Sequence, residues 1–178
     1  TVNFGSFKEY NMKNRFFNLD LAGGAMLDIG VYALSIVRSF MQKTPDQIVS
    51  QWLPSPTGSD EQATMLLQND LGQMATVALS MHSKQPKRTM ISLEKGYIEI
   101  MEYPRADKAF IVDAAAGDRR EICAGQAANA LYYEMKDMED AILSGDDSIM
   151  RLAQSKDVMD IMTKVRKDWN LKYPGEVW

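Results

Sequence analysis

The sequence predicts an α+β fold, in which a large, open and mostly antiparallel β-sheet carries helices packed on one face. Three observations support this: a helical stripe near the start, seven strand-length segments joined by short links, and two helical stripes at the end. Short links without helical crossovers favour antiparallel pairing. The length of 178 residues suits one domain, so residues 1–178 are expected to form a single unit.

The first helix is expected from about Gly24 to Gln42. Its apolar side chains recur every three or four residues and share one face, namely Met26, Ile29, Ala33, Ile36, Val37 and Phe40. Gly30 lies inside this helix, where glycine costs about 1 kcal/mol relative to alanine. We therefore expect another part of the chain to pack closely against the backbone at Gly30.

Seven expected strands follow, separated by turn signals such as the run from Asn69 to Gly72. They are Ile48 to Leu53, Gln62 to Gln68, Gly72 to His82, Arg88 to Leu93, Tyr97 to Met101, Ala109 to Val112 and Arg119 to Cys123. In the third strand, Ala75, Val77, Leu79 and Met81 share one face, and both faces are poor in charge. The face away from the helices is therefore expected to be buried in a homo-oligomer.

Two further helices are expected at the end of the chain. In the first, Leu131, Met135, Met138 and Ile142 form an apolar stripe, and in the second, from Ser155 to Asp168, the inward side chains are Val158, Met159, Met162, Val165 and Trp169. Methionine on such stripes usually fills gaps in a core. Both helices are expected to cover the same face of the sheet.

Composition excludes several classes of protein. The 20 basic and 24 acidic residues give a net charge of −4, and 46% of residues are hydrophobic, which is typical of neither a disordered chain nor a nucleic-acid binder. We expect no membrane partner, because no signal peptide or long apolar span stands out. The single cysteine, Cys123, forms no internal disulfide and favours a reducing cytoplasm. The start at Thr1, without methionine, suggests a chain cut from a larger protein.

Metal and nucleophile chemistry have little support in the sequence. His82 is the only histidine and Cys123 the only cysteine, so no zinc ligand set can be assembled and no metal is expected. His82 lies in an alternating segment and is interpreted as an ordinary strand residue. The sequence has no Walker motif and no Gly-x-Gly, so the usual phosphate-binding loop of a dinucleotide-binding domain is missing.

The most informative residues lie in the first helix. Asp28 and Tyr32 are four positions apart and share a helical face, with Ser35 about one turn further on. A tyrosine hydroxyl is a hydrogen-bond donor at neutral pH and can act as a general acid toward a carbonyl oxygen. Spacing alone leaves another interpretation open, in which Asp28 only caps backbone amides and Tyr32 packs with its hydroxyl exposed.

The run from Gly23 to Tyr32, Gly-Gly-Ala-Met-Leu-Asp-Ile-Gly-Val-Tyr, resembles the Gly-Gly-x-x-x-Asp-x-Gly-x-His/Tyr segment of the Gfo/Idh/MocA oxidoreductases. Weaker similarities follow in the family's order, among them Thr57 to Glu61, Tyr133-Glu134-Met135 and Tyr173-Pro174. The resemblance implies a C-terminal substrate-binding and dimerisation domain, with the N-terminal Rossmann domain that binds NAD or NADP absent from this chain.

The resemblance also implies roles for individual residues. Asp28 matches the family's active-site aspartate, and Tyr32 matches a position held by histidine in many members and by tyrosine in those similar to dihydrodiol and xylose dehydrogenases. Arg15 and Gly24 are expected to position substrate or cofactor, although a solvated surface arginine is an equal alternative for Arg15. The family's Glu-Lys-Pro lysine has no counterpart, because Glu94-Lys95-Gly96 is a hairpin turn.

The implied activity is hydride transfer between NAD(P) and a sugar, polyol or dihydrodiol-like substrate, with Tyr32 moving the proton. Without its nucleotide-binding domain the chain is expected to be inactive. The alternative is a non-catalytic binding or oligomerisation module on the same fold.

Overall fold

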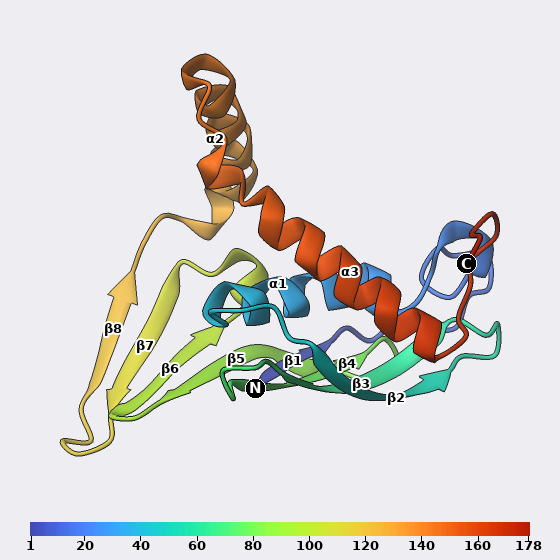
Figure 1. Ribbon diagram of the computed structural model, residues 1–178, viewed down its shortest axis with the longest axis horizontal. Coiled ribbons are helices and arrows are strands. Elements are labelled where there is room, and N and C mark those ends of the chain that lie inside the picture. Colours follow the sequence, from blue (N-terminus) through green and yellow to red (C-terminus); the bar gives the residue numbers. More distant parts are fainter.

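All eight strands of the protein lie in one sheet, as the computed structural model of residues 1–178 shows (Figure 1). The strands are β1 (Val2–Gly5), β2 (Gln47–Pro54), β3 (Asp60–Gln68), β4 (Met74–Ser80), β5 (Gln85–Leu93), β6 (Gly96–Met101), β7 (Lys108–Asp113) and β8 (Arg119–Cys123). Their order across the sheet is β2-β3-β4-β1-β5-β6-β7-β8. The predicted α+β class and all seven predicted strands are confirmed, although the third ends at Ser80 and not at His82.

The central strand β1 is the element that the sequence did not reveal, because four residues are too few to display a period. It pairs in parallel with β4, with Val2 opposite Val77, and antiparallel with β5, with Val2 opposite Thr89. Every other pairing in the sheet is antiparallel. The position of β1 brings the segment that follows it beside the first helix.

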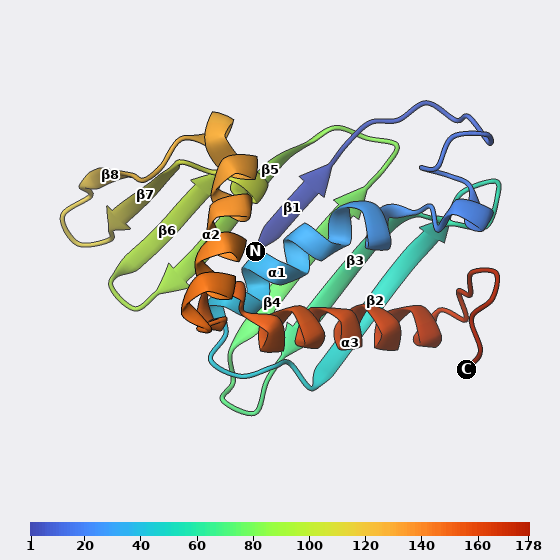
Figure 2. The ribbon, with the colours of Figure 1, turned by 90° about the horizontal axis from the view of Figure 1, so that it is seen from above.

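Two helices cover one face of the sheet, over β1 to β4 (Figure 2). Helix α1 (Val31–Phe40) follows a π-helical segment, Met26–Gly30, and packs beside α3 (Leu152–Asp168). The core between the layers includes Met26, Ala33, Leu34, Val77, Leu79, Val158, Met162 and Val165. A Cβ atom on Gly30 would lie 3.1 Å from Leu79 Cδ1, so the expected close approach at this glycine is confirmed.

The expected stripe of the first helix is buried for most of its length, but Phe40 at its end is largely exposed. The segment Leu19–Phe40 is also long and apolar enough to cross a membrane, with a mean hydropathy of 1.4, contrary to the expectation of no such span. Half of that window is buried inside the protein, and a core helix of a soluble protein meets the same criterion.

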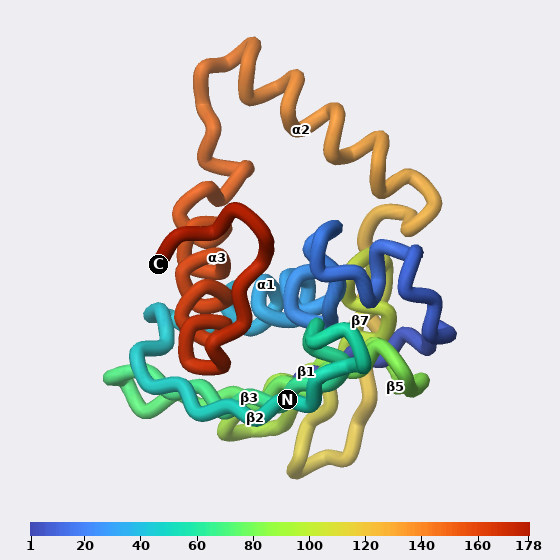
Figure 3. The backbone as a smooth tube through the Cα atoms, turned by 90° about the vertical axis from the view of Figure 1, so that its right-hand side faces the viewer, coloured from blue at the N-terminus to red at the C-terminus, as the bar shows by residue number.

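Helix α2 (Ala130–Ser144) does not cover the sheet, and the expectation that it would is wrong. It stands away from the other helices (Figures 1 and 3), and Leu131, Met135, Met138 and Ile142 are 45–73% exposed. Periodicity indicates that a helix face is apolar but not what covers it. Helix α3 packs beside α1 instead. On α3, Met159 is exposed, so its predicted inward position is wrong.

The opposite face of the sheet is open and has two different halves. Over β2 to β4 its side chains are uncharged, including the exposed Val49, Leu66 and Met74. Over β5 to β8 it carries ion pairs, Arg88–Glu99, Arg119–Glu99 and Lys108–Glu121. The low charge expected for this face therefore extends over only part of the sheet.

Candidate functional site

The candidate site lies where the segment after β1 meets the beginning of the first helix. Hydrogen bonds hold the glycine pair there: the Gly24 N–H donates to the Phe16 carbonyl at 3.0 Å, the Gly23 N–H donates to the Asn18 carbonyl at 2.9 Å, and the Tyr173 hydroxyl donates to the Gly23 carbonyl at 2.8 Å. A Cβ atom on Gly23 would lie 2.3 Å from the Arg15 carbonyl oxygen. The first glycine is therefore required because the loop from Arg15 to Asn18 passes directly over it.

Gly24 is required for a different reason. Its φ of +126° is unfavourable for any other residue, and a Cβ atom would lie 2.0 Å from Asp60 Oδ1. Asp60 is fully buried, and its Oδ2 accepts a hydrogen bond from the Met26 N–H at 2.5 Å. This geometry gives Gly24 a structural task, which is to let Asp60 cap the helix; no contact here assigns it to substrate or cofactor.

Asp60 is the buried acid that sequence reasoning left without a role. Burial raises the pKa of its carboxyl group to about 7, against the lowering effects of the Met26 N–H and of Arg166. Its Oδ1 has no hydrogen-bond partner. The run Thr57 to Glu61 was the available signal, but it did not indicate that the aspartate reaches a helix over 30 positions earlier.

Asp28 forms an ion pair with Arg15, with 2.5 Å between the carboxylate Oδ1 and the guanidinium Nη1. The carboxylate is mostly buried and the arginine is mostly exposed. No backbone amide donates to the Asp28 carboxylate, so the alternative in which this residue is a simple cap is wrong, and Asp60 accepts from the helix start instead. The other half of that alternative agrees with the structure, because Tyr32 packs near Phe4 and is 47% exposed. Two of the four predicted site residues, Arg15 and Asp28, are therefore in direct contact, which their spacing in the sequence did not predict.

Tyr32 lies one turn beyond Asp28 with its side chain 47% exposed. Its ring packs near Phe4, with 6.0 Å between ring centroids, and its hydroxyl forms no hydrogen bond within the protein, not even with Asp28. A free hydroxyl beside an ion-paired carboxylate is available to a bound hydroxyl or carbonyl group.

Two lysines that sequence reasoning missed add positive charge around these residues. Lys8 and Arg15 each approach the ring of Phe16, at 4.5 Å from its centroid, and Lys87 lies 5.4 Å from the centroid of Phe4. Their place depends on β1, whose position was not predicted. The site thus combines cationic donors with one ion-paired carboxylate, next to the buried Phe4 and the half-buried Phe16.

His82 supports the segment that carries Lys8. Its Nδ1 lies 2.9 Å from the Lys8 carbonyl oxygen, and its ring stacks on Tyr10 with 4.1 Å between centroids. The Tyr10 hydroxyl in turn donates to the buried Glu61. The interpretation of His82 as a strand residue is wrong, because β4 ends at Ser80 and His82 lies just beyond it.

The glycine pair and the helix start do not form a binding site for a dinucleotide phosphate. Protein atoms closely approach both members of the glycine pair. The Met26 N–H at the helix start already donates to Asp60 and is not available to a phosphate. The residues around Tyr32 fit the substrate side of a reaction better than the dinucleotide side.

Comparison with known families gives a clear match. The model of the GFO/IDH/MocA C-terminal domain matches residues 1–99, more than half of the chain. Among curated proteins, the trans-1,2-dihydrobenzene-1,2-diol dehydrogenase of Xenopus laevis is 25% identical over 163 residues, covering 87% of this chain and 49% of its own length. The rabbit enzyme, from Oryctolagus cuniculus, is 26% identical over 167 residues, covering 87% and 50%.

Solved structures share the fold. KijD10, a 3-ketoreductase from Actinomadura kijaniata solved in complex with NADP and TDP-benzene, superposes with a TM-score of 0.76 at 18% identity, covering 93% of this chain and 52% of its own. The aldose-aldose oxidoreductase of Caulobacter crescentus, complexed with glycerol, gives 0.71 at 20% identity, covering 94% and 52%. The chain thus spans about half the length of the proteins that it matches.

Proposed function

The chain belongs to the GFO/IDH/MocA family, whose C-terminal domain it represents, and from this premise we propose that it is the substrate-binding half of an NAD(P)-dependent oxidoreductase. The observation that carries the proposal is the free Tyr32 hydroxyl, one helical turn from an Asp28 carboxylate that Arg15 holds in place. A purely structural helix start has no need of this arrangement, since Asp60 already caps the helix.

In the proposed reaction Tyr32 moves the proton. Its hydroxyl donates to the carbonyl oxygen of the substrate, or accepts the proton of the alcohol in the opposite direction. The Asp28 carboxylate accepts hydrogen bonds from neighbouring substrate hydroxyls, while Arg15 fixes its orientation. NAD or NADP, when bound, supplies or accepts the hydride.

We propose a sugar, polyol or dihydrodiol as the substrate class. Its hydroxyl groups suit a site that combines the Asp28 carboxylate with the cationic donors Lys8 and Arg15. The curated relatives are dihydrodiol dehydrogenases, and one structural neighbour is an aldose-aldose oxidoreductase, which supports the same class.

We also propose that further chain N-terminal to Thr1 supplies the nucleotide-binding half. The relatives are about twice as long as the part that this chain matches, which supports the proposal. The exposed apolar stripe on α2 supports this, because an uncovered apolar helix face is a surface on which a second domain can dock. The 178 residues alone are then expected to have no turnover. The exposed free thiol of Cys123 is compatible with a cytoplasmic location, which we propose as well.

The test is Tyr32→Phe in the protein that contains both halves. Loss of the hydroxyl should lower kcat by about 10²–10⁴-fold with little change in folding, because general acid–base catalysis contributes that much. Tyr97→Phe is the matched control, since Tyr97 lies on β6, on the open face of the sheet and away from the site. If Tyr32→Phe leaves kcat unchanged, the role of Tyr32 is wrong, and a protein without any turnover would favour a non-catalytic binding module.

A further inference from the structure

The turn between β2 and β3 is hydrogen-bonded to the loop that carries Arg15. The Thr57 hydroxyl in this turn donates to the Phe17 carbonyl, 40 positions earlier in the chain. The neighbouring Phe16 carbonyl accepts from the Gly24 N–H at 3.0 Å. Two consecutive carbonyl groups therefore bind two different parts of the fold, and Arg15 directly precedes them in the chain.

The Thr57 hydroxyl belongs to a cluster of three hydroxyl groups. Its Oγ1 lies 2.8 Å from Ser55 Oγ, which in turn lies 2.8 Å from Ser59 Oγ. A carbonyl oxygen can only accept, so Thr57 donates its single proton to Phe17 and accepts from the serines. Both serines are buried, so the Thr57 hydroxyl is held in one place and directed at the loop.

The other end of the loop is bound to the same part of β3. The Tyr10 hydroxyl donates to the Glu61 carboxylate, and the Tyr10 ring packs against the ring of Phe17 with 4.9 Å between centroids. Glu61 and Phe17 are both buried, whereas the residues from Asn11 to Arg15 are exposed. The loop thus has two buried anchors, the Tyr10–Glu61 and Phe17–Thr57 hydrogen bonds, on either side of one exposed stretch.

We propose that Thr57 and Glu61 are positioning residues for substrate binding, because they anchor the loop that carries Arg15. The proposal rests on the proposed function, in which Asp28 accepts hydrogen bonds from substrate hydroxyls and Arg15 fixes its orientation. Both residues act through the loop and not by contact with the substrate. Proton transfer depends on Tyr32, which lies on the helix and not on the loop.

The Arg15 side chain needs such anchors because little else holds it. It is 61% exposed, and an ion pair with so exposed a guanidinium contributes little by itself. Ordering a long side chain in one geometry costs conformational entropy, and a fixed backbone reduces the number of positions that the side chain can reach. Loss of an anchor is therefore expected to weaken binding and to leave the chemical step almost unchanged.

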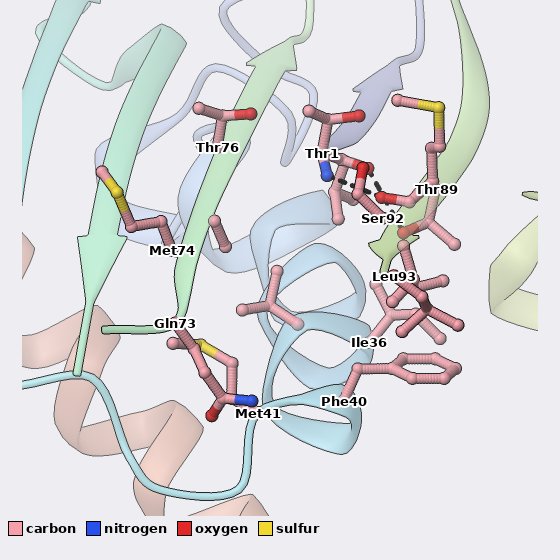
Figure 4. Close-up of a pocket in the computed structure, with 15 residues that line it drawn as sticks. Thr1, Ile36, Phe40, Met41, Gln73, Met74, Thr76, Thr89, Ser92 and Leu93 are labelled. Carbon is pink, nitrogen blue, oxygen red and sulfur yellow. Dashed lines mark hydrogen bonds between the residues drawn. The ribbon is translucent and has the colours of Figure 1, made fainter. Parts of the chain in front are cut away.

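The experiment compares Thr57→Val with Thr57→Ser in the protein that contains both halves. Valine removes the hydroxyl and keeps the shape, whereas serine keeps the hydroxyl. In Thr57→Val, KM should rise about tenfold with kcat within about twofold of wild type, and Thr57→Ser should restore KM. Thr76→Val is the matched control, because Thr76 is also half-buried but lines an apolar pocket of about 380 Å³ with the far end of α1 (Figure 4).

Two more variants show whether the effect passes through the loop to Arg15. In an Arg15→Met background, Thr57→Val should raise KM no further, because the positioned side chain is already absent. Tyr10→Phe removes only the hydroxyl at the other anchor and should also raise KM. The proposal is overturned by an equal rise from Thr57→Val in both backgrounds, by a fall in kcat at unchanged KM, or by a rise in Thr57→Ser as large as in Thr57→Val.

Trypsin cleavage tests the anchors without turnover. Cleavage after Arg15 should be about tenfold faster in Thr57→Val than in wild type, because the loop detaches more often. Cleavage after Arg151, in the exposed link between α2 and α3, should keep its rate and so exclude general unfolding. An unchanged rate after Arg15 would overturn the proposal even in a protein without turnover. A faster rate there, with kcat unaffected in Tyr32→Phe, would show that only the role of Tyr32 is wrong.

Discussion

Gly24 and Asp60 together determine how the first helix begins, and so where Asp28 and Tyr32 point. The carboxylate reaches the Met26 N–H only because Gly24 has no side chain, and the glycine conformation is one that other residues rarely adopt. A motif that resembles a ligand-binding glycine pair is thus explained by contacts inside the protein. The substrate-facing residues are positioned indirectly, through this buried contact.

Gly24→Ala should destabilise the protein strongly. The new methyl group would meet Asp60 Oδ1 at 2.0 Å in an unfavourable backbone conformation, so we expect a loss of about 3 kcal/mol or more in the free energy of unfolding. Gly72→Ala is the matched control, because Gly72 also has positive φ but nothing within 4 Å, and should lose only about 1 kcal/mol. Urea unfolding measures both, and equal losses would contradict the assigned contact.

Asp60 should make stability fall with rising pH. Its pKa of about 7 in the folded chain lies above the ordinary value of 3.8, so between these values the folded chain holds a proton that the unfolded chain has released. The free energy of unfolding therefore decreases through that range, by up to about 4 kcal/mol, and levels off above pH 7.

Asp60→Asn isolates this effect, because the amide keeps an oxygen for the Met26 N–H but does not titrate in this range. The difference in unfolding free energy between wild type and variant, measured by urea unfolding from pH 4 to pH 8, should change steadily in favour of the variant. A difference independent of pH would show that Asp60 ionises freely in the folded state.

At the residue scale, the sequence predicted which residues belong to the site better than it predicted which residues they contact. Asp28, Tyr32, Arg15 and Gly24 were all selected, yet the ion pair of Asp28 with Arg15 crosses 13 positions through a loop, and the contact of Gly24 with Asp60 crosses 36. Local spacing carries no information about such contacts. They depend on a tertiary fold that brings β3 beneath the helix start.

At the element scale, α2 and α3 show the limit of periodicity. Both have methionine-rich stripes, but only that of α3 lies on the sheet. The seven strands were predictable because turn residues bracket each of them, whereas β1 was too short to show alternation. An amphipathic pattern therefore predicted that α2 is a helix, but the surface that covers it lies outside these 178 residues in our proposal.

A pair of substitutions tests this difference between the helices. Met162→Ser on α3 should cost about 3 kcal/mol or more in unfolding free energy, because its side chain is 2% exposed. Met135→Ser on α2 should change it by less than about 0.5 kcal/mol in the chain alone, because its side chain is 71% exposed. A large loss for Met135→Ser, measured by urea unfolding, would mean that α2 packs onto the body in solution.

At the scale of the whole molecule, the open face of the sheet is the surface we propose for a homodimer. Its β2 to β4 half is uncharged and includes exposed apolar side chains, which a monomer in water has no reason to align. In a two-fold dimer the same patch of both copies is in contact. A single substitution in the middle of the patch therefore changes both sides of the interface. Leu66 on β3, 46% exposed and flanked by β2 and β4, has that position.

Leu66→Glu should convert the dimer to a monomer without unfolding it. The substitution buries two carboxylates at the interface of the dimer but leaves them in water on the monomer, so the association constant should fall by 100-fold or more, about 3 kcal/mol. Sedimentation velocity over a range of protein concentrations measures the change, with urea unfolding as the check on folding. Leu152→Glu is the control, because Leu152 is also exposed but lies on α3, on the other side of the sheet. A dimer that survives Leu66→Glu, or a wild-type chain that sediments only as a monomer, would show that the open face is not a dimer surface.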